Sequence, residues 1–293
     1  MHIIEVEQLK YTYPGASQET LHGLDFAVEE AEIVGFLGPS GAGKSTTQKI
    51  LIGLLKNYQG RVQVLEREVA AWGADFYEHI GVSFELPNHH QRLTALENLQ
   101  LFGSLYAGKS RDPMELLERV HLAGDANKRV MDFSKGMKIR LNVARSLLNS
   151  PRVLFLDEPT SGLDPVNAQH VKDLVLELRE QGTTIVLTTH DMMVADQLCD
   201  RVAFITAGEI REFEDPRTLK LRHGRRVVRV EYRLPFEDRS EVEHEEFELD
   251  GLGENEAFLG LIRRCVIERI HTQETTLEQV FIEVTGEQLR GHA

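Results

Sequence analysis

The chain has 293 residues, and this length predicts about two domains. Hydrophobic residues make up 41% of the sequence, which is enough to form buried cores and argues against a disordered chain. The 47 acidic residues exceed the 33 lysines and arginines and give a formal net charge of -14. This charge argues against wholesale binding to nucleic acid or to an anionic membrane surface, and predicts no nucleic-acid partner.

The N-terminal segment MHIIEVEQLKYTYPG carries scattered charges, so we expect no signal peptide. No segment of the sequence approaches the roughly 20 apolar residues that a membrane-spanning helix needs. The two cysteines, Cys199 and Cys265, lie far apart and lack the spacing of metal ligands. We expect two reduced structural thiols in a cytoplasmic protein.

Short apolar segments predict strands early in the chain, within HIIEVEQL and LDFAVEEAEIVGFLG. A glycine-rich loop and a helix follow in GPSGAGKSTTQKILIGLL, and residues 93–149 have a largely helical pattern. The apolar runs RVLFLDEPT and GTTIVLTTH are bounded by turn residues and separated by a segment of helical length. This alternation predicts parallel strands buried on both faces of an α/β sheet.

The strongest motif is GPSGAGKS, residues 38–45, which matches G-x-x-x-x-G-K-[ST] at every fixed position. Its glycines let backbone N–H groups face a phosphate, Lys44 reaches the β- and γ-phosphates of ATP, and the Ser45 hydroxyl is a ligand for Mg²⁺. The residues predicted to bind nucleotide in and directly after this loop are Gly38, Pro39, Ser40, Gly41, Ala42, Gly43, Lys44, Ser45 and Thr46.

Two adjacent acidic residues, Asp157 and Glu158, end the apolar run VLFLDEP. Two carboxylates at the end of a buried strand are costly without a cation, so we expect Asp157 to hold Mg²⁺. Glu158 is the predicted general base that activates the attacking water. An ordinary acidic turn is the alternative. His190 ends the next apolar strand, and we expect it to emerge at the same sheet edge and reach the γ-phosphate.

A second anion site is predicted within MDFSKGMKIRLNVARSLL, residues 131–148, where Ser134 and Gly136 open an amphipathic helix. The N-terminus of a helix presents free N–H groups and a partial positive charge, and both attract a phosphate.

The order of these motifs resembles the nucleotide-binding subunit of ABC transporters over residues 3 to about 215. The family's signature L-S-G-G-Q stands here as FSKGM, with Lys135 and Met137 as departures. The resemblance implies that Ser134 and Gly136 contact the γ-phosphate of ATP bound to a second subunit. One cassette per chain then implies a head-to-tail dimer with two composite sites, and a homodimer is favoured over a heterodimer.

Further residues acquire roles from the same resemblance. Tyr13 matches the aromatic residue that stacks on adenine, with Tyr11 as the nearby alternative. The segment SGLD, residues 161–164, matches the loop that communicates between the two sites. Glu85 stands where the family has a glutamine that contacts Mg²⁺ and the membrane subunit. It keeps an oxygen ligand but adds a negative charge, and a simple surface acid is the alternative.

The composition changes at residues 214–226, after which we expect a small α+β tail domain. The acidic segment EDRSEVEHEEFELD, residues 237–250, predicts a solvated edge strand with a bulge, and a specific acidic binding face is the alternative. A helix is expected over residues 256–264, then a strand in CVIERI and a short helix capped by Thr276. The ending ETTLEQVFIEVTGE resembles that of ATPases serving drug, antibiotic and lipid- or polysaccharide-related exporters with separate membrane subunits.

The predicted fold is an α/β P-loop NTPase, an ABC cassette with a mixed core sheet, plus a small C-terminal α+β extension. We expect the cassette over residues 1–220, with a helical subdomain at about 86–150, and the accessory domain over residues 221–293. The resemblance implies hydrolysis of ATP with Mg²⁺, coupled to export through an integral membrane permease. The protein would lie on the cytoplasmic face of the cell membrane.

Other ATPase classes fit the sequence less well. An ABC machine of DNA repair or chromosome organisation would interrupt the cassette with a long coiled coil. A translation-factor ATPase would carry two cassettes in one chain, and a plain P-loop kinase would lack the signature and the histidine. The cassette motifs fit both export and import, and the tail favours export.

Overall fold

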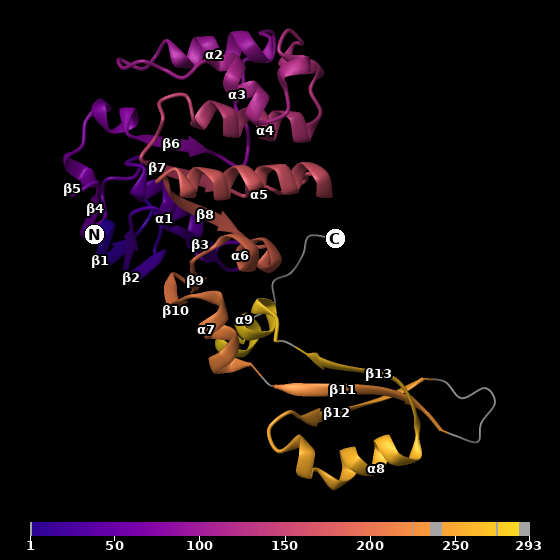
Figure 1. Cartoon of the computed structure of the whole chain (residues 1–293). Coiled ribbons are helices and arrows are strands. Elements are labelled where there is room, and N and C mark those ends of the chain that lie inside the picture. The colour runs from indigo at the N-terminus through magenta and orange to yellow at the C-terminus, as the bar shows by residue number, and fades with distance from the viewer. Residues whose placement is uncertain (1, 225, 235–241, 274, 287–293) are drawn as a thin grey trace. The chain divides into compact units, whose positions relative to one another are not determined.

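The computed structural model describes residues 2–224, 226–234, 242–273 and 275–286 (Figure 1). Contacts between residues divide the chain into a first compact unit that extends to Pro216 and a second unit over Arg217–Gly286. Each unit has its own core and is described by itself.

The first unit is built around a six-stranded sheet with the order β10-β9-β3-β8-β7-β6, in which β10 runs antiparallel to β9 and the other pairs are parallel. Its strands are β3 (Ile33–Leu37), β6 (Ile80–Ser83), β7 (Val153–Asp157), β8 (Thr184–Thr189), β9 (Arg201–Thr206) and β10 (Glu209–Glu214). Strands β3 and β8 are buried along their whole length, which accounts for their nearly unbroken apolar sequences. The predicted parallel strands of an α/β sheet are confirmed.

A four-stranded antiparallel sheet, in the order β2-β1-β4-β5, accompanies the larger one. It contains β1 (His2–Tyr11), β2 (Leu21–Glu29), β4 (Gln59–Val64) and β5 (Arg67–Glu68), and the short 3₁₀ turns η1 (Val69–Ala71) and η2 (Ala74–Glu78) follow it. One hydrophobic core draws side chains from both sheets and from α1 (Lys44–Leu51), and it includes Phe26 and Phe36 in edge-to-face contact. Helix α1, which follows the phosphate-binding loop, is therefore anchored in the main core.

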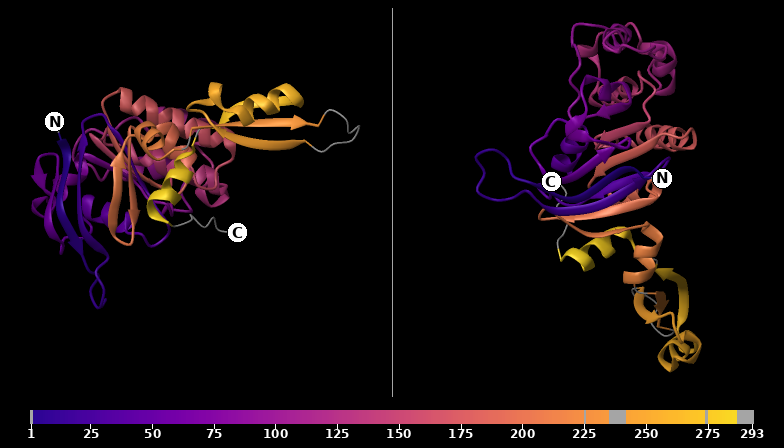
Figure 2. Two further views of the ribbon diagram at one scale, coloured as in Figure 1. Left: turned by 90° about the horizontal axis from the view of Figure 1, so that it is seen from below. Right: turned by 90° about the vertical axis from the view of Figure 1, so that its left-hand side faces the viewer.

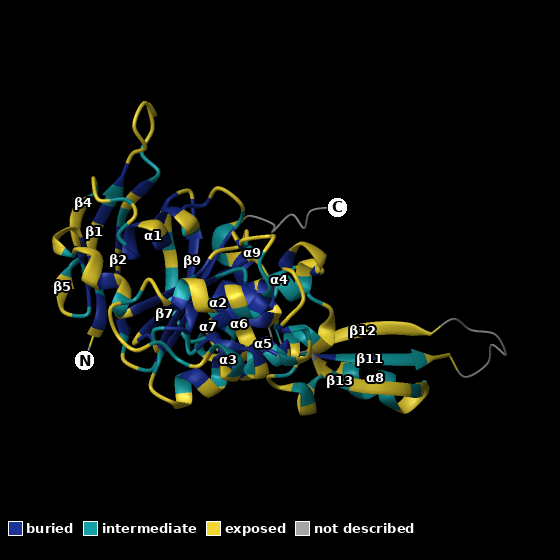
Figure 3. Ribbon diagram, turned by 90° about the horizontal axis from the view of Figure 1, so that it is seen from above, coloured by how far each residue is buried: buried dark blue, intermediate teal, exposed yellow. Residues whose placement is uncertain are grey.

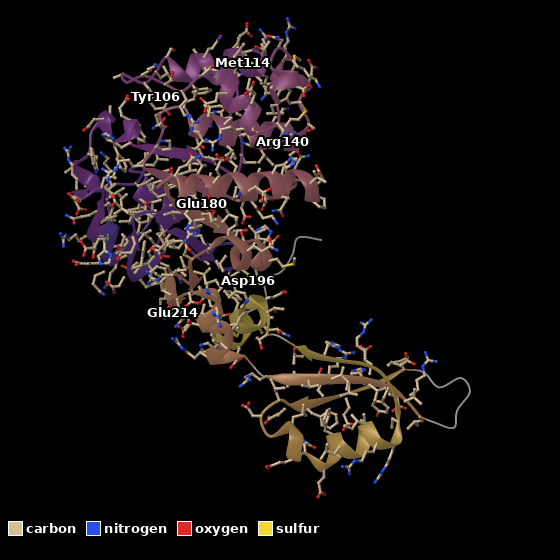
Figure 4. The ribbon with its side chains drawn as sticks, in the orientation of Figure 1. Tyr106, Met114, Arg140, Glu180, Asp196 and Glu214 are labelled. Atoms are coloured by element: carbon tan, nitrogen blue, oxygen red, sulfur yellow. The ribbon has the colours of Figure 1, made fainter. Side chains whose placement is uncertain are left out.

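Three helices gather beyond the β6 edge of the larger sheet, as Figures 1 and 2 show: α2 (Ala95–Gly103), α3 (Pro113–Arg119) and α4 (Lys135–Ser146), with the turns η3 (Ala123–Asp125) and η4 (Val130–Asp132) between them. Of the three, α4 packs against β6. Thr94 caps α2 in a reciprocal capping box with Glu97, and Asp112 caps α3. Arg140 on α4, labelled in Figure 4, donates to the carbonyls of Val120 and His121 at 2.8 and 3.0 Å. These bonds fix α4 to the end of α3.

Helix α5 (Pro165–Glu180) separates β7 from β8, and α6 (Met192–Leu198) separates β8 from β9. Asp164 caps α5 by accepting from the N–H of Asn167, and Pro165 occupies the first helical position, where its missing N–H costs nothing. The buried side chains of α5 repeat at helical spacing and are Val171, Leu174, Val175 and Leu178.

The second unit contains a three-stranded antiparallel sheet in the order β12-β11-β13 and a helix packed on it. Its elements are α7 (Pro216–His223), β11 (Val227–Arg233), β12 (Glu243–Glu248), the turn η5 (Leu252–Glu254), α8 (Glu256–Arg264), β13 (Val266–Gln273) and α9 (Leu277–Thr285). The core of the sheet joins Val230 and Phe247 to Phe258 of α8. Thr276 caps α9 in a capping box with Gln279, which confirms the predicted helix start.

The acidic segment forms an edge strand as predicted, and Figure 3 shows that β12 is exposed along most of its length. The predicted bulge is wrong, because β11 and β12 pair without a register shift from Val227–Glu248 to Tyr232–Glu243. Phe247 points into the core, while His244 lies on the opposite face and is exposed. Alternation across the two faces accounts for the pattern without an extra residue. Residues 237–241 of the prediction lie outside the described residues.

Across the described ranges, no helix has both the length and the apolar composition to cross a membrane. Cys199 is buried and Cys265 is partly exposed, and both carry free thiols, as the sequence predicts.

Candidate active site

Four adjacent strands of the larger sheet bring the predicted site residues to one edge. Strands β3, β8, β7 and β6 are parallel neighbours, so their carboxyl ends lie together. The loop of residues 38–43 follows β3, His190 follows β8, Asp157 and Glu158 end β7, and Glu85 follows β6. Open α/β sheets bind ligands at this edge.

The loop after β3 curls around the Lys44 ammonium. Its Nζ donates to the carbonyl oxygens of Gly38 and Pro39 at 2.6 and 3.0 Å. A Cβ on Gly38 would lie 2.0 Å from the carbonyl oxygen of Ile205, so only glycine fits there. Gly41 has a φ of +84° and nothing within 4 Å of where a Cβ would be. The loop is therefore tightly held on its inner side and open on its outer side, as a phosphate cradle requires.

Three carboxylates share the electrostatic environment of Lys44. Burial lowers the pKa of Lys44, and the negative charges of Glu158, Asp157 and Glu85 oppose this shift. The structure thus brings the predicted acidic residues together around one cation. A titratable cluster of this kind, at the ligand-binding edge of a sheet, is typical of an active site.

Glu158 is held by the last residue of β8, Thr189, and by His190, which follows it. Its Oε1 lies 2.7 Å from Nδ1 of His190, and its Oε2 accepts from the Thr189 hydroxyl at 3.2 Å. Burial raises the pKa of Glu158, while the bonds from His190 and Thr189 and the charge of Lys44 lower it. Its backbone has a φ of +49°, a left-handed conformation that is uncommon for non-glycine residues. The carboxylate is therefore fixed in direction.

Sequence reasoning missed the two threonines that hold the acidic pair. The Thr188 hydroxyl donates to Asp157, and Thr189 donates to Glu158. Both contacts follow from the pairing of β7 with β8, which sets Asp157 opposite Thr188. The two threonines directly before His190 could have indicated this role, because buried carboxylate oxygens need hydrogen-bond donors and hydroxyl groups supply them.

The two tyrosines near the N-terminus have different environments. Tyr11 is only 4% exposed and belongs to the core, whereas Tyr13 is 36% exposed. The Tyr13 hydroxyl lies 3.1 Å from Oγ1 of Thr46, in the first turn after the phosphate-binding loop. This placement favours Tyr13 over Tyr11 as the residue available to a nucleotide base.

The predicted second anion site is at the N-terminus of α4. Ser134 caps the helix by accepting from the N–H of Met137 at 3.2 Å. A Cβ on Gly136 would lie 3.1 Å from the Leu163 side chain, and the Lys135 side chain covers Gly162. The signature segment and the loop of residues 161–164 are therefore in contact.

The loop that carries Glu85 includes a buried histidine, His89. Its Nε2 donates to the carbonyl of Lys138 on α4 at 3.0 Å. Burial lowers the pKa of His89 to about 4; the bond to the Lys138 carbonyl opposes this shift, and the positive charges of Arg145, Lys138 and His90 reinforce it.

This shift predicts an acid-sensitive first unit. In the unfolded chain His89 titrates near 6.5, so its contribution is complete above that pH and is lost between about pH 6.5 and pH 4. His89→Gln keeps an N–H donor. In this variant, the free energy of unfolding should fall by about 1 kcal/mol less between pH 7.5 and pH 5.5 than it does in the wild type. Urea unfolding followed by the fluorescence of Trp72, the single tryptophan, measures this. His22→Gln is the exposed control, and equal pH dependence in all three proteins would contradict the prediction.

The donor set suits a magnesium nucleotide. Mg²⁺ takes oxygen ligands, and it commonly combines one or two carboxylates with phosphate oxygens and water. The hydroxyl of Ser45 and the carboxylates of Asp157 and Glu85 are ligands of this kind. Among the described residues, no group of three or more His, Cys, Asp or Glu side chains could hold a metal ion alone. A metal here would need the phosphates of a nucleotide.

Comparison with known proteins identifies the family. Residues 21–161 match the ABC transporter family, and residues 226–274 match the fluoroquinolone efflux ABC transporter C-terminal domain. The chain is 54% identical to the fluoroquinolones export ATP-binding protein of Mycobacterium tuberculosis (strain H37Rv), over 98% of this chain and 94% of the relative. The chain belongs to the ABC transporter ATP-binding family.

Other members of the ABC family agree with this assignment. The Nod factor export ATP-binding protein I of Rhizobium sp. (strain N33) is 35% identical over 92% of this chain and 93% of the relative. A dimeric ATP-binding cassette in a post-hydrolysis state, bound to ADP and Pi, superposes with a TM-score of 0.67 at 29% identity, covering 72% of this chain and 98% of that one. The predicted ABC cassette fold is confirmed, and the chain is an ATP-binding ATPase of this family.

Proposed function

We propose that the chain is the ATP-hydrolysing subunit of a membrane exporter and that it acts as a dimer of cassettes. The observation that carries this proposal is the 54% identity, over 98% of the chain, to a protein named for fluoroquinolone export. The match includes the second unit, where residues 226–274 fit a fluoroquinolone efflux domain. The dimer is supported by the dimeric state of a related cassette, and a homodimer is the simplest arrangement for one cassette per chain.

We propose that each composite site takes its phosphate-binding loop from one copy and its signature from the other. Lys44 would hold the β- and γ-phosphates, and Tyr13 would stack on the adenine. The residues proposed to bind ATP are Tyr13, Gly38, Pro39, Ser40, Gly41, Ala42, Gly43, Lys44, Ser45 and Thr46 of one copy with Ser134 and Gly136 of the other. The proposed sharing of each site between two copies is supported by the N-terminus of α4 at Ser134. It is distinct from the loop of residues 38–43, and its free N–H groups can bind an anion.

Glu158 is the proposed general base, because its carboxylate is fixed at the sheet edge beside Lys44. One carboxylate oxygen of Glu158 would take a proton from the attacking water. His190 would orient the Glu158 carboxylate through Nδ1, and its Nε2 would remain available to contact the γ-phosphate. Mg²⁺ held by Ser45, Asp157 and Glu85 would neutralise charge on the phosphates.

The carboxylate of Glu85 makes the metal dependence testable. Glu85, Asp157, Glu158 and the phosphates would repel one another, and bound Mg²⁺ offsets this repulsion. The ATPase rate of the wild type should therefore depend steeply on free Mg²⁺. Glu85→Gln should flatten that dependence with little loss of maximal rate, and Glu85→Ala should also weaken coupling to the permease. Rates measured against free Mg²⁺, with and without the permease in lipid, test this. Superimposable curves would make Glu85 a surface acid.

An apolar hollow on the first unit is the proposed docking surface of the permease. It has a volume of about 210 Å³ and is lined mainly by Ile52, Leu54, Tyr77, Ile80, Val82, Phe84, Phe102 and Tyr106. Leu54, Tyr77 and Phe84 are between 38 and 54% exposed, and exposed apolar groups of this size commonly mark protein interfaces. Phe84 directly precedes Glu85, so a partner here would contact the loop of the nucleotide site.

The decisive experiment joins transport to this ATPase. Cells that produce the chain with its permease should accumulate less of a fluoroquinolone than cells with the Glu158→Gln variant. The permease should also copurify with the tagged chain from detergent-solubilised membranes, as expected if the protein is bound to it on the cytoplasmic face of the membrane. Equal drug accumulation in the two strains would contradict export of a fluoroquinolone by this ATPase, and absence of copurification would contradict the permease partner. We propose residues 1–220 as the cassette, with the helical subdomain at about 86–150, and residues 221–293 as an accessory domain.

A further inference from the structure

A buried polar network joins the strand before Glu85 to the signature helix. Asn142 on α4 is 1% exposed, and its Nδ2 donates to Oγ of Ser83 at 2.9 Å and to the carbonyl of Phe84 at 2.8 Å. Its Oδ1 accepts from Nη2 of Arg145 at 2.6 Å, and Nη1 of Arg145 donates to the carbonyl of Asn88 at 2.9 Å. The Asn142 side chain therefore uses both donors and its acceptor.

The network fixes the two residues directly before Glu85. Ser83 is the last residue of β6, and Phe84 follows it, so their bonds to Asn142 set the direction in which the chain leaves the strand. Ser134, at the N-terminus of the same helix, lies two turns before Asn142 on α4. One rigid helix thus connects the loop of Glu85 with the signature residue.

We propose that Asn142 is a positioning residue that couples Glu85 to the signature helix. Because Asn142 is hydrogen-bonded to Ser83 and Phe84, a shift of Glu85 on metal binding displaces α4 and with it Ser134. Binding of the magnesium nucleotide at one composite site therefore changes the position of the signature residue that completes the other composite site. The metal part of this inference rests on the proposed role of Glu85.

The chain offers a matched control in Asn149. Its Nδ2 also donates to two carbonyls, those of Tyr77 and Ile80 at 2.9 and 2.8 Å, but at the opposite end of β6. Asn142→Ala and Asn149→Ala therefore each remove two donated bonds at one end of β6, and only the first touches the end that precedes Glu85. Asn142→Asp keeps the shape and the bond from Arg145, but it replaces the Nδ2 donor with a charged acceptor that repels the Phe84 carbonyl. Thermal unfolding of both Asn142 variants therefore shows first that each of them is folded.

Two measurements on the full chain test the proposal. The first is hydrogen exchange of residues 84–90, which should be about tenfold faster in both Asn142 variants than in Asn149→Ala. The second is binding of a fluorescent ATP analogue as free Mg²⁺ is varied. Both Asn142 variants should shift its half-saturating Mg²⁺ about threefold or more, and Asn149→Ala should match the wild type.

The outcomes separate this proposal from the role of Glu85. Exchange that is equal in the Asn142 and Asn149 variants would overturn it, and so would a Mg²⁺ shift that persists when Asn142→Ala is combined with Glu85→Ala. If Glu85→Ala alone leaves Mg²⁺ dependence unchanged, the proposed metal role of Glu85 fails. Hydrogen exchange then decides whether Asn142 positions the loop.

Discussion

The variant Glu158→Gln should bind ATP almost as well as the wild type and hydrolyse it about 10²- to 10⁴-fold more slowly, the range expected for loss of a general base. Glutamine keeps the size of the side chain and its hydrogen-bonding capacity toward His190 and Thr189, so the site should stay assembled. The amide cannot take a proton from water. Trapped ATP should therefore accumulate, and dimers that persist with bound ATP should be visible by size-exclusion chromatography.

The matched control is Glu180→Gln, an exposed residue at the end of α5 that is labelled in Figure 4. It makes the same chemical change away from the sheet edge and should leave the steady-state rate unchanged. Normal hydrolysis by Glu158→Gln would remove Glu158 from its catalytic role, and weak ATP binding would show that the variant damages the site itself.

Ser134→Arg should lower hydrolysis at least about a hundredfold, comparable to the loss of a preorganised phosphate donor. The guanidinium would fill the space in front of the α4 N-terminus and block the γ-phosphate of ATP held by the other copy. Binding of a fluorescent ATP analogue to the monomer should be unaffected. Lys44→Ala, in contrast, should weaken this binding directly, because it removes the cation enclosed by the phosphate loop.

Mixing the two variants tests whether the sites are composite. A mixed dimer has one site with both lesions and one site with neither, so activity should return although each variant alone is inactive. With free exchange at equal amounts, about a quarter of the wild-type rate is expected. Absence of recovery over a range of ratios, in dimers shown to exchange, would contradict composite sites that work independently. If the Lys44→Ala variant alone bound the fluorescent ATP analogue as tightly as the wild type, the assignment of the phosphate loop would be contradicted.

Much of the site could be predicted because its signals are local. The phosphate loop needs its glycines and Lys44 within one short segment, and the start of α4 is marked by Ser134 as a cap. The alternation of buried strands and helices placed Asp157 and His190 at strand ends, and parallel pairing then brought those ends together.

The rest depends on residues far apart in the sequence. The threonines that hold Asp157 and Glu158 act across the pairing of β7 with β8, and their register cannot be read from either strand alone. Asn142 meets Ser83 across 59 residues. The predicted bulge within residues 237–250 was wrong because exposed positions occur on both faces of β12, so polarity alone did not identify the inner face.

The acid-rich edge of the small sheet has a consequence for behaviour at high protein concentration. An open strand edge is a template for pairing with other chains, and such pairing leads to aggregation. On β12 the exposed residues include Glu243, Glu245, Glu246 and Glu248. If β12 of one copy paired with β12 of a second copy, the glutamates of the two strands would lie close together. Repulsion between their carboxylates would oppose the formation of a continuous sheet. The β12 edge of the second unit is thereby protected against forming fibres, and high salt or low pH would weaken this protection.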